Sequence, residues 1–322
     1  MTAATPSVRE ASELVGRIVA EVGRAVVGKE AELRLVLAGL LADGHVLLED
    51  LPGVGKTLSA RSIATVTGLG FARAQFTPDL LPSDITGGLV LDLATRTPEF
   101  RAGPVFTNLL LADEVNRSPA KTQAALLEAM QERQVTVDGT ARPLPRPFLV
   151  IATQNPIESE GTYPLPEAQL DRFILRAAMG YPAAEHELSM LRQRVDRRAD
   201  ETALDAVCDR DGFAGLQAAV ETVHIDDRLL EYVLALVAAT RAAPDLAVGV
   251  SPRGSLALTK LSRAYALVVG RDYVTPDDVR ALVVPALAHR VVLRETAWAR
   301  GTQAAAVLRH VADSVPAPSI SA

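Results

Sequence analysis

The run Gly53-Val54-Gly55-Lys56-Thr57 constrains the fold of this chain more than any other feature of its sequence. It follows a short apolar segment typical of a buried strand and precedes a helical pattern. Glycines allow the backbone to curl so that its N–H groups point toward phosphate oxygens, and the helix N-terminus adds positive dipole character. The run therefore predicts a phosphate-binding loop between a strand and a helix, and we include Leu58 among its contacts.

Two side chains of this loop would carry the binding chemistry. We expect Lys56 to bridge the β- and γ-phosphates of ATP, and Thr57 to place its hydroxyl on Mg²⁺, which prefers hard oxygen ligands. The usual G-x-x-x-x-G-K-[ST] pattern begins with glycine, but Asp50 stands at that position here. A carboxylate near phosphates needs an explanation, such as a side chain that points away from the loop, and the sequence leaves the role of Asp50 open.

A second chemical motif lies downstream, where the apolar segment 109–111 continues into Ala112-Asp113-Glu114. Paired acids that close a strand after a phosphate loop indicate catalysis: Asp113 would hold magnesium, and Glu114 would orient and deprotonate a water. A solvated strand end is the alternative. A later strand ends at Asn155, whose amide could polarise the same water or belong to an ordinary turn. Gln75 could relay occupancy of the site to Glu114, or it could be an ordinary amide at the end of a strand.

Short apolar segments alternate with helical patterns in the first half of the chain. This alternation predicts an α/β core, residues 1–180, with a parallel sheet covered by helices on both faces. After residue 182 the pattern becomes helical only, which predicts a second, helical domain over 181–315 and a disordered tail over 316–322. Caps are expected at Asp226 or Asp227 and at Thr275. The expected strands cover residues 45–49, 71–76, 108–114 and 148–155.

Two stretches interrupt this rhythm and are predicted to be hairpins. One runs from Gly88 to Phe106 around residues 95–98, and the other spans residues 135–142 around Asp138-Gly139. Asp-Gly is a strong signal for a two-residue turn. These hairpins are either surface loops or contacts with a substrate or a neighbouring subunit.

Composition restricts the class of protein. With 322 residues and 48% hydrophobic content, the chain can bury two cores, and its single cysteine, Cys208, excludes an internal disulfide. No uncharged apolar run approaches the roughly 18 residues of a membrane span, so we predict a soluble, cytoplasmic protein with no membrane partner. A net charge of -6 and 4% aromatic residues argue against nucleic acid as a partner.

Four stretches of the chain resemble the MoxR branch of the AAA+ ATPases: LLEDLPGVGKT, LLLADEVNRSPAKTQAALLEAMQERQVTVDG, ATQNPIESEGTYPLPEAQLDRF and SPRGSLAL. The resemblance runs from about Val26 to His289. It implies a core with a parallel sheet of strand order 5-1-4-3-2, a helix 2 insert, a pre-sensor hairpin, a helical lid domain and a homo-hexameric ring. Both inserts coincide with the two predicted hairpins.

The resemblance also implies roles that spacing alone does not identify. Asn155 matches the first sensor, and Arg172 resembles an arginine finger that reaches into the neighbouring subunit's site. Arg253 resembles the second sensor, on the lid. A surface salt bridge for Arg172 and a helix-start charge for Arg253 are the alternatives. Val27 and Gly28 resemble the segment that packs on adenine, although by themselves they read as a helix end.

The function implied by the resemblance is an ATPase that remodels client proteins. Such a protein would use ATP turnover to assemble or mature client complexes, together with a partner that carries a von Willebrand factor A domain. Two other functions stay open: a nucleic-acid motor or loader, and a nucleotide-gated scaffold without appreciable turnover. Charge and aromatic content count against the motor.

Overall fold

A computed structural model describes residues 5–156 and 162–319. In chain order, the first part contains α1 (Val8–Ala25), α2 (Glu30–Leu41), β1 (His45–Glu49), α3 (Lys56–Val66), β2 (Phe71–Gln75), α4 (Pro82–Thr86), β3 (Gly87–Leu91), β4 (Pro98–Ala102), β5 (Leu109–Asp113), a 3-10 helix (Val115–Arg117), α5 (Ala120–Glu132), β6 (Gln134–Val137), β7 (Thr140–Pro143), β8 (Leu149–Gln154), α6 (Glu167–Leu170) and β9 (Phe173–Ala177). The remaining elements are α7 (Ala184–Arg197), α8 (Arg210–Val220), α9 (Asp227–Ala242), β10 (Leu246–Val248), α10 (Pro252–Val268), α11 (Pro276–Leu287), β11 (Val292–Leu293), α12 (Glu295–Ala299) and α13 (Ala304–Ser314).

The centre of the molecule is a five-stranded parallel sheet of order β2-β5-β8-β1-β9. Numbered by their order within this sheet, the strands run 5-1-4-3-2, so the predicted strand order is confirmed. The four strands expected from apolar runs all belong to this sheet, and β1 has the predicted bounds. The carboxyl ends of parallel strands lie at the same edge of the sheet, so the phosphate loop after β1 and the acids closing β5 meet at that edge.

Side chains of the central strands alternate between two separate hydrophobic cores. Leu109 and Leu111 of β5 belong to the larger core, whereas Leu110 and Ala112 belong to the smaller one. Because successive side chains of a strand point to opposite faces, a strand buried on both faces must be apolar throughout. This explains why the core strands show no polar alternation.

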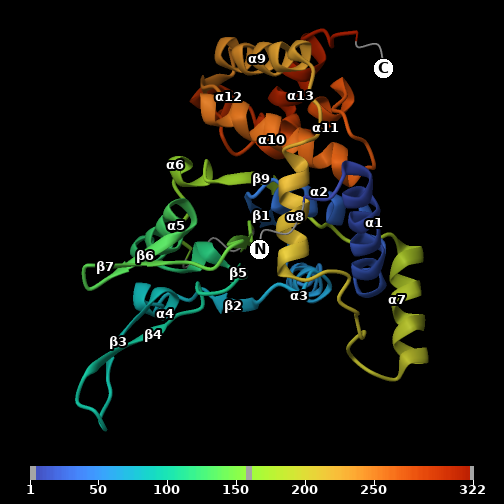
Figure 1. Ribbon diagram of the computed structural model, residues 1–322. Coiled ribbons are helices and arrows are strands. Elements are labelled where there is room, and N and C mark those ends of the chain that lie inside the picture. The colour runs from blue at the N-terminus through green and yellow to red at the C-terminus, as the bar shows by residue number, and fades with distance from the viewer. Residues whose placement is uncertain (1–4, 157–161, 320–322) are drawn as a thin grey trace.

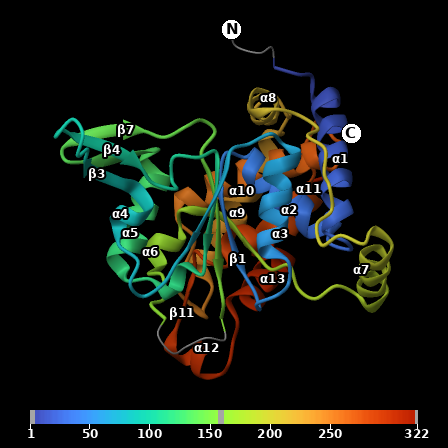
Figure 2. The ribbon, with the colours of Figure 1, turned by 90° about the horizontal axis from the view of Figure 1, so that it is seen from below.

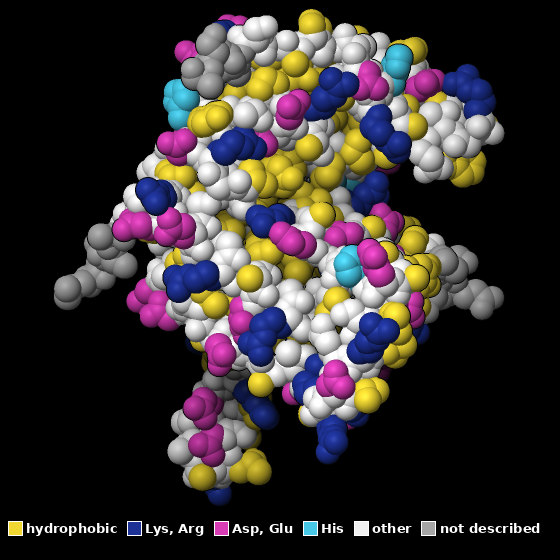
Figure 3. All heavy atoms as spheres, turned by 90° about the vertical axis from the view of Figure 1, so that its right-hand side faces the viewer, with side chains coloured by type: hydrophobic (Ala, Val, Ile, Leu, Met, Phe, Trp, Pro, Cys, Tyr) yellow, Lys and Arg dark blue, Asp and Glu magenta, His cyan; other side chains and the backbone are white. Residues whose placement is uncertain are grey.

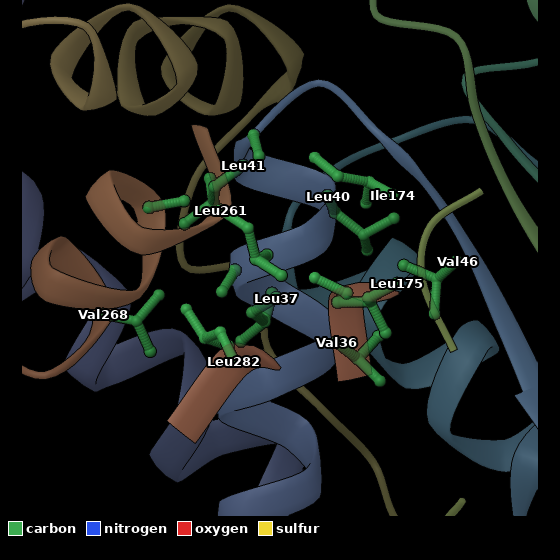
Figure 4. Packing of buried hydrophobic residues seen from close by; sticks show 14 of the residues in the cluster. Val36, Leu37, Leu40, Leu41, Val46, Ile174, Leu175, Leu261, Val268 and Leu282 are labelled. Atoms are coloured by element: carbon green, nitrogen blue, oxygen red, sulfur yellow. The ribbon is translucent and has the colours of Figure 1, made fainter. Parts of the chain in front are cut away.

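Helix α2 connects the sheet to the helices of the second half of the chain. Its Leu40 lies beside Leu175 of β9, and its Leu41 lies beside Leu261 of α10 (Figure 4). Helices α9 to α13 gather on this side, above the sheet in Figure 1. The apolar face of α2 is thus buried by strand and helices together, and burial of each leucine contributes about 1.5–3 kcal/mol.

The second half of the chain is helical, as expected, and its helix starts follow the predicted caps. Asp226 caps α9, and Thr275 forms a capping box with Asp278 at the start of α11. The short antiparallel ribbon of β10 and β11 was not predicted, because strands of three and two residues are too short to show a period. The predicted tail lies partly outside the described residues, and the domain boundary at residue 180 stays a prediction.

Both predicted hairpins are present. β3 pairs with β4, β6 pairs with β7, and the turn residues Asp138 and Gly139 both have positive φ, at 50° and 72°. The β3–β4 hairpin extends far from the sheet (Figures 1 and 2). Among the helices of residues 5–156 and 162–319, none is long and apolar enough to cross a membrane.

A buried histidine begins the central strand β1. The Nδ1 atom of His45 accepts the Val150 N–H at 3.1 Å, and Nε2 lies 3.1 Å from the carbonyl oxygen of Met130. The ring is therefore neutral, with its proton on Nε2. Burial, aided by the nearby Arg133 guanidinium, lowers the pKa of His45 from 6.5 to about 3.

This depressed pKa predicts acid sensitivity. The unfolded chain binds a proton at His45 below about pH 6.5 while the folded chain does not, so stability is lost as pH falls from 6.5 toward 3. Between pH 7 and pH 5, His45 should remove about 2 kcal/mol of unfolding free energy. His45→Gln should lose correspondingly less over this interval in urea titrations. The exposed His310 supplies the control, because His310→Gln should keep the wild-type dependence.

Candidate active site

A pocket of about 350 Å³ opens at the carboxyl edge of the sheet, between the loop after β1 and the ends of β5 and β8. It is lined by Pro52, Gly53, Gly55, Lys56, Thr57, Leu58, Asp113, Glu114, Thr153 and Asn155. Residues predicted from two separate motifs therefore share one pocket. The side chain of Val54 is buried in the core and does not line it, so only the main chain of Val54 can reach a ligand here.

The loop owes its shape to two glycines. Gly53 and Gly55 have φ values of 81° and 86°, in the left-handed region where a side chain costs about 1–2 kcal/mol. Gly55 is the N-cap of α3, so the helix starts directly behind the loop. The first N–H groups of α3 have no partners within the helix, which makes this end a binding site for anions.

Lys56 is the cation of this pocket. Its Nζ atom donates to the carbonyl oxygen of Asp50 at 2.6 Å. Burial lowers the pKa of the Lys56 ammonium, and three carboxylates oppose this shift, those of Asp50, Asp113 and Glu114. The ammonium group thus stands between the base of the loop and the acids at the end of β5.

Thr153 joins the two acids and, like Pro52, is a pocket residue that sequence reasoning missed. The Glu114 N–H donates to Thr153 Oγ1 at 2.8 Å, and this hydroxyl donates to Asp113 Oδ1 at 2.6 Å. Glu114 has a positive φ of 58°, which is costly for a residue with a side chain. A signal was available, because Thr153 interrupts an apolar strand two residues before Asn155 and so shares its face.

Residues on the edge strand β2 hold the outer oxygens of both acids. Arg73 donates to Asp113 Oδ2 at 2.6 Å and to Gln75 Oε1 at 2.6 Å. Gln75 in turn donates to Glu114 Oε2 at 3.0 Å, and Arg117 pairs with the same oxygen at 3.1 Å. The hydrogen bond between Gln75 and Glu114 is compatible with a relay role for Gln75, which stays a prediction, and Arg73 was not foreseen.

The pocket fits a magnesium ion. Thr57 and Asp113 present oxygen atoms to the same space, and the Arg73 guanidinium on Asp113 shows that this carboxylate already faces a positive charge. Within the described residues, no group of three or more His, Cys, Asp or Glu side chains could hold a metal unaided. Two protein ligands are enough for Mg²⁺, which typically takes one or two and completes its shell with phosphate oxygens and water.

Besides Val54, four of the predicted site residues lie outside the pocket lining: Val27, Gly28, Arg172 and Arg253. Gly28 follows α1 and packs closely against His186 of α7. Arg172 directly precedes β9, and its guanidinium forms no ion pair within residues 5–156 and 162–319. Arg253, in the first turn of α10, lies 3.9 Å from the Asp171 carboxylate.

The turn that follows α11 holds the residues on either side of Arg172 by hydrogen bonds. The buried Arg290 donates to the carbonyl oxygen of Asp171 at 2.9 Å, to its carboxylate, and to the carbonyl oxygen of Phe173 at 2.7 Å. His289 contacts the same Phe173 oxygen at 2.9 Å. The helices of the second half of the chain are thereby tied to the start of β9.

Comparison with known protein families agrees with this fold. Residues 45–175 match the family described as "ATPase family associated with various cellular activities (AAA)", and residues 238–311 match the AAA lid domain. The first match contains the phosphate loop, both acids and Asn155. The second begins near the end of α9 and ends within α13. The chain is thus an ATPase with an AAA core and a helical lid.

Relatives along nearly the whole chain narrow this class. The chain is 43% identical over 317 residues to "Chaperone MoxR1" of Mycobacterium tuberculosis, covering 95% of this chain and 83% of that protein. It is 50% identical over 305 residues to the uncharacterized protein YeaC of Bacillus subtilis, covering 95% of each. A crystal structure of a candidate ATPase from Cytophaga hutchinsonii is 39% identical, with a TM-score of 0.89 and 96% of each chain covered. The chain belongs to the MoxR family of AAA+ ATPases.

The phosphate loop can be tested through its lysine. Lys56→Ala should weaken ATP binding about 100-fold or more, because the ammonium is expected to contact two phosphates at about 1.5–3 kcal/mol each. Binding of a fluorescent ATP analogue measures the loss. Lys121→Ala, an exposed lysine on α5, should bind like wild type. Unchanged affinity in Lys56→Ala would mean that the loop has been misinterpreted.

The hydroxyl of Thr153 can be tested with two variants of similar shape. Thr153→Val leaves the Glu114 N–H without its acceptor and should reduce turnover about 10-fold or more, with ATP affinity within about threefold of wild type. Thr153→Ser keeps the hydroxyl and should retain turnover. Steady-state kinetics separate kcat from KM. Equal kcat values for the valine and serine variants would remove this hydroxyl from the site.

Proposed function

We propose that this chain is a remodelling ATPase that works as a ring and uses ATP turnover to assemble or mature client protein complexes. The observation that carries the proposal is the single pocket shared by the phosphate loop and the acids of β5. The relative named "Chaperone MoxR1" supports the client-directed role. A partner with a von Willebrand factor A domain and a cytoplasmic location belong to the same proposal.

Each pocket residue has a role in the proposed reaction. Main-chain N–H groups from Gly53 to Leu58 and the Lys56 ammonium bind the phosphates of ATP. Thr57 and Asp113 hold Mg²⁺, which when bound neutralises charge on the phosphate oxygens. Glu114 accepts a proton from the attacking water, and Asn155 orients that water.

Glu114 needs to be released before it can act as a base. Its Oε2 atom accepts a hydrogen bond from Gln75 and pairs with Arg117, so this oxygen already has two donors. The mechanism therefore includes a shift of these donors when substrate is in place. The need for this shift would keep turnover low until substrate occupies the site.

The predicted site residues that lie outside the pocket also have roles in the proposed mechanism, one of them in the neighbouring subunit. Arg172 would enter the site of the neighbouring subunit and stabilise charge on the transferred phosphoryl group. Arg253 would sense the γ-phosphate from the lid, and Val27 and Gly28 would pack on adenine. A hexamer is the ring that we propose, with residues 1–180 as the core and residues 181–315 as the lid.

A nucleic-acid motor is the alternative that the surface disfavours. Figure 3 shows Lys and Arg side chains interspersed with Asp and Glu side chains over one face, without a basic stripe there. Proteins that bind nucleic acid usually concentrate positive charge. ATP turnover that rises with DNA and falls steeply with added salt would favour the motor.

The base assignment predicts the phenotype of Glu114→Gln. The amide cannot accept a proton, so turnover should fall about 100-fold or more while ATP binding is kept. ADP release in a single turnover and binding of a fluorescent ATP analogue measure the two quantities. Glu128→Gln, an exposed acid on α5, is the matched control. Equal ADP release from Glu114→Gln and wild type would leave a nucleotide-gated scaffold as the better description.

The role of Arg172 predicts complementation between subunits. Rings of Arg172→Ala alone, or of Glu114→Gln alone, should be inactive, because a finger contributes about 1,000-fold or more. Mixing the two should restore some turnover, since an interface can then combine an intact Glu114 with an intact Arg172. Absence of recovery at every mixing ratio, with ring assembly verified by size, contradicts action between subunits.

A further inference from the structure

Asp50 replaces the first glycine of the phosphate loop, and its side chain has a partner far along the chain. Its Oδ2 atom accepts the N–H of Gly180 at 2.5 Å, and Oδ1 accepts the N–H of Leu51 at 2.7 Å. The carboxylate thus points away from the pocket. Gly180 belongs to residues 179–186, which lead from β9 into α7 and are called the connecting segment below.

Asp50 also holds the lysine of the loop. Its carbonyl oxygen accepts from Lys56 Nζ at 2.6 Å, and its own N–H donates to Gln154 at the end of β8. Asp50 is buried, with 9% exposure, and a buried carboxylate is costly unless it is hydrogen-bonded or paired. Two N–H donors and the nearby ammonium group offset that cost. A single residue therefore contacts both the phosphate-binding lysine and the connecting segment.

Two further contacts attach the connecting segment to the loop after α1. Lys29 Nζ, buried at 7% exposure, donates to the carbonyl oxygen of Tyr181 at 2.9 Å. His186 covers Gly28 so closely that a Cβ atom on Gly28 would lie 2.4 Å from His186 Cγ. The segment therefore touches the base of the phosphate loop at one end and, at the other, a residue predicted to pack on adenine.

These anchors determine the position of α7. None of the side chains described for α7 is buried, and the helix lies beyond α1, away from the sheet (Figures 1 and 2). Burial of apolar surface therefore contributes little to holding α7 in place. Hydrogen bonds at the connecting segment hold the chain just before the helix begins, so a displacement of Gly180 would be passed to the start of α7.

We propose that Asp50 is a positioning residue that couples occupancy of the phosphate loop to the connecting segment and to α7. Lys56 and Gly180 both bind Asp50, so a phosphate that attracts the Lys56 ammonium alters the partners of the residue that holds Gly180. The inference rests on the proposed function, because it takes the ligand of Lys56 to be a nucleotide phosphate. It also explains why aspartate stands where glycine is usual: glycine has no carboxylate to bind Gly180.

Hydrogen exchange with and without ADP tests this coupling. In the wild type, ADP at about 100 times its Kd should slow exchange of residues 179–186 about 10-fold or more. Asp50→Gly restores the usual loop pattern, so ADP affinity should stay within about threefold of wild type. Exchange of the segment should then be faster and independent of ADP, and kcat should fall about 10-fold with little change in KM.

Two further variants complete the experiment. Asp50→Asn keeps one acceptor oxygen for Gly180 and should retain the ADP effect in reduced form, even where Asp50→Gly folds poorly. Glu49→Gln removes the neighbouring carboxylate, which pairs with Arg176 of β9 at 2.9 Å, and should behave like wild type. Thermal melting of each variant verifies folding.

The outcomes separate the coupling from the proposed function. Wild type that binds ADP without any change in exchange at residues 179–186 overturns the coupling and leaves the ATPase intact. The same protection in Asp50→Gly as in wild type also overturns it. Wild type that binds neither ADP nor ATP overturns the proposed function, and the coupling with it.

Discussion

The register of the parallel strands is the constraint on which the rest of this structure depends. Ala112 of β5 pairs with Ala152 of β8, and Leu48 of β1 pairs with Thr153 of β8. These pairings place Asp113 beside Thr153 and bring both next to the start of the phosphate loop. A slip of one residue would turn each of these side chains to the opposite face of the sheet. Hydrophobic packing on both faces prevents that slip.

Much of the fold could be predicted because each strand of the core is buried on two sides. Runs such as Leu109 to Ala112 are apolar throughout, and this property is visible without knowledge of neighbours. Which strand lies beside which is not a local property, so Arg73 and Thr153 could not be assigned to Asp113 from the sequence. Leu230 of α9 is apolar yet 39% exposed, so an apolar residue does not by itself identify the buried face of a helix.

The aspartate in place of the first glycine of the phosphate-loop pattern was informative, but it did not reveal the partner of its side chain. Charge repulsion suggested a direction for the Asp50 side chain, whereas its partner Gly180 lies 130 positions away and is defined only by tertiary structure. The same limit applies to Lys29, which reads as a surface lysine at a helix start and is in fact buried. Long-range polar contacts of this kind leave no periodic trace in a sequence.

The hydrogen bonds from Arg290 to Asp171 and Phe173 have a mechanical consequence. Separating the turn after α11 from the start of β9 would break several hydrogen bonds and strand a buried guanidinium, at a cost of about 3–5 kcal/mol. The contact of Arg290 with Asp171 and Phe173 is therefore rigid, and bending between the two halves of the chain does not occur there. The helical half and β9 therefore move as one unit, and in the proposed ring Arg172 would follow any displacement of these helices.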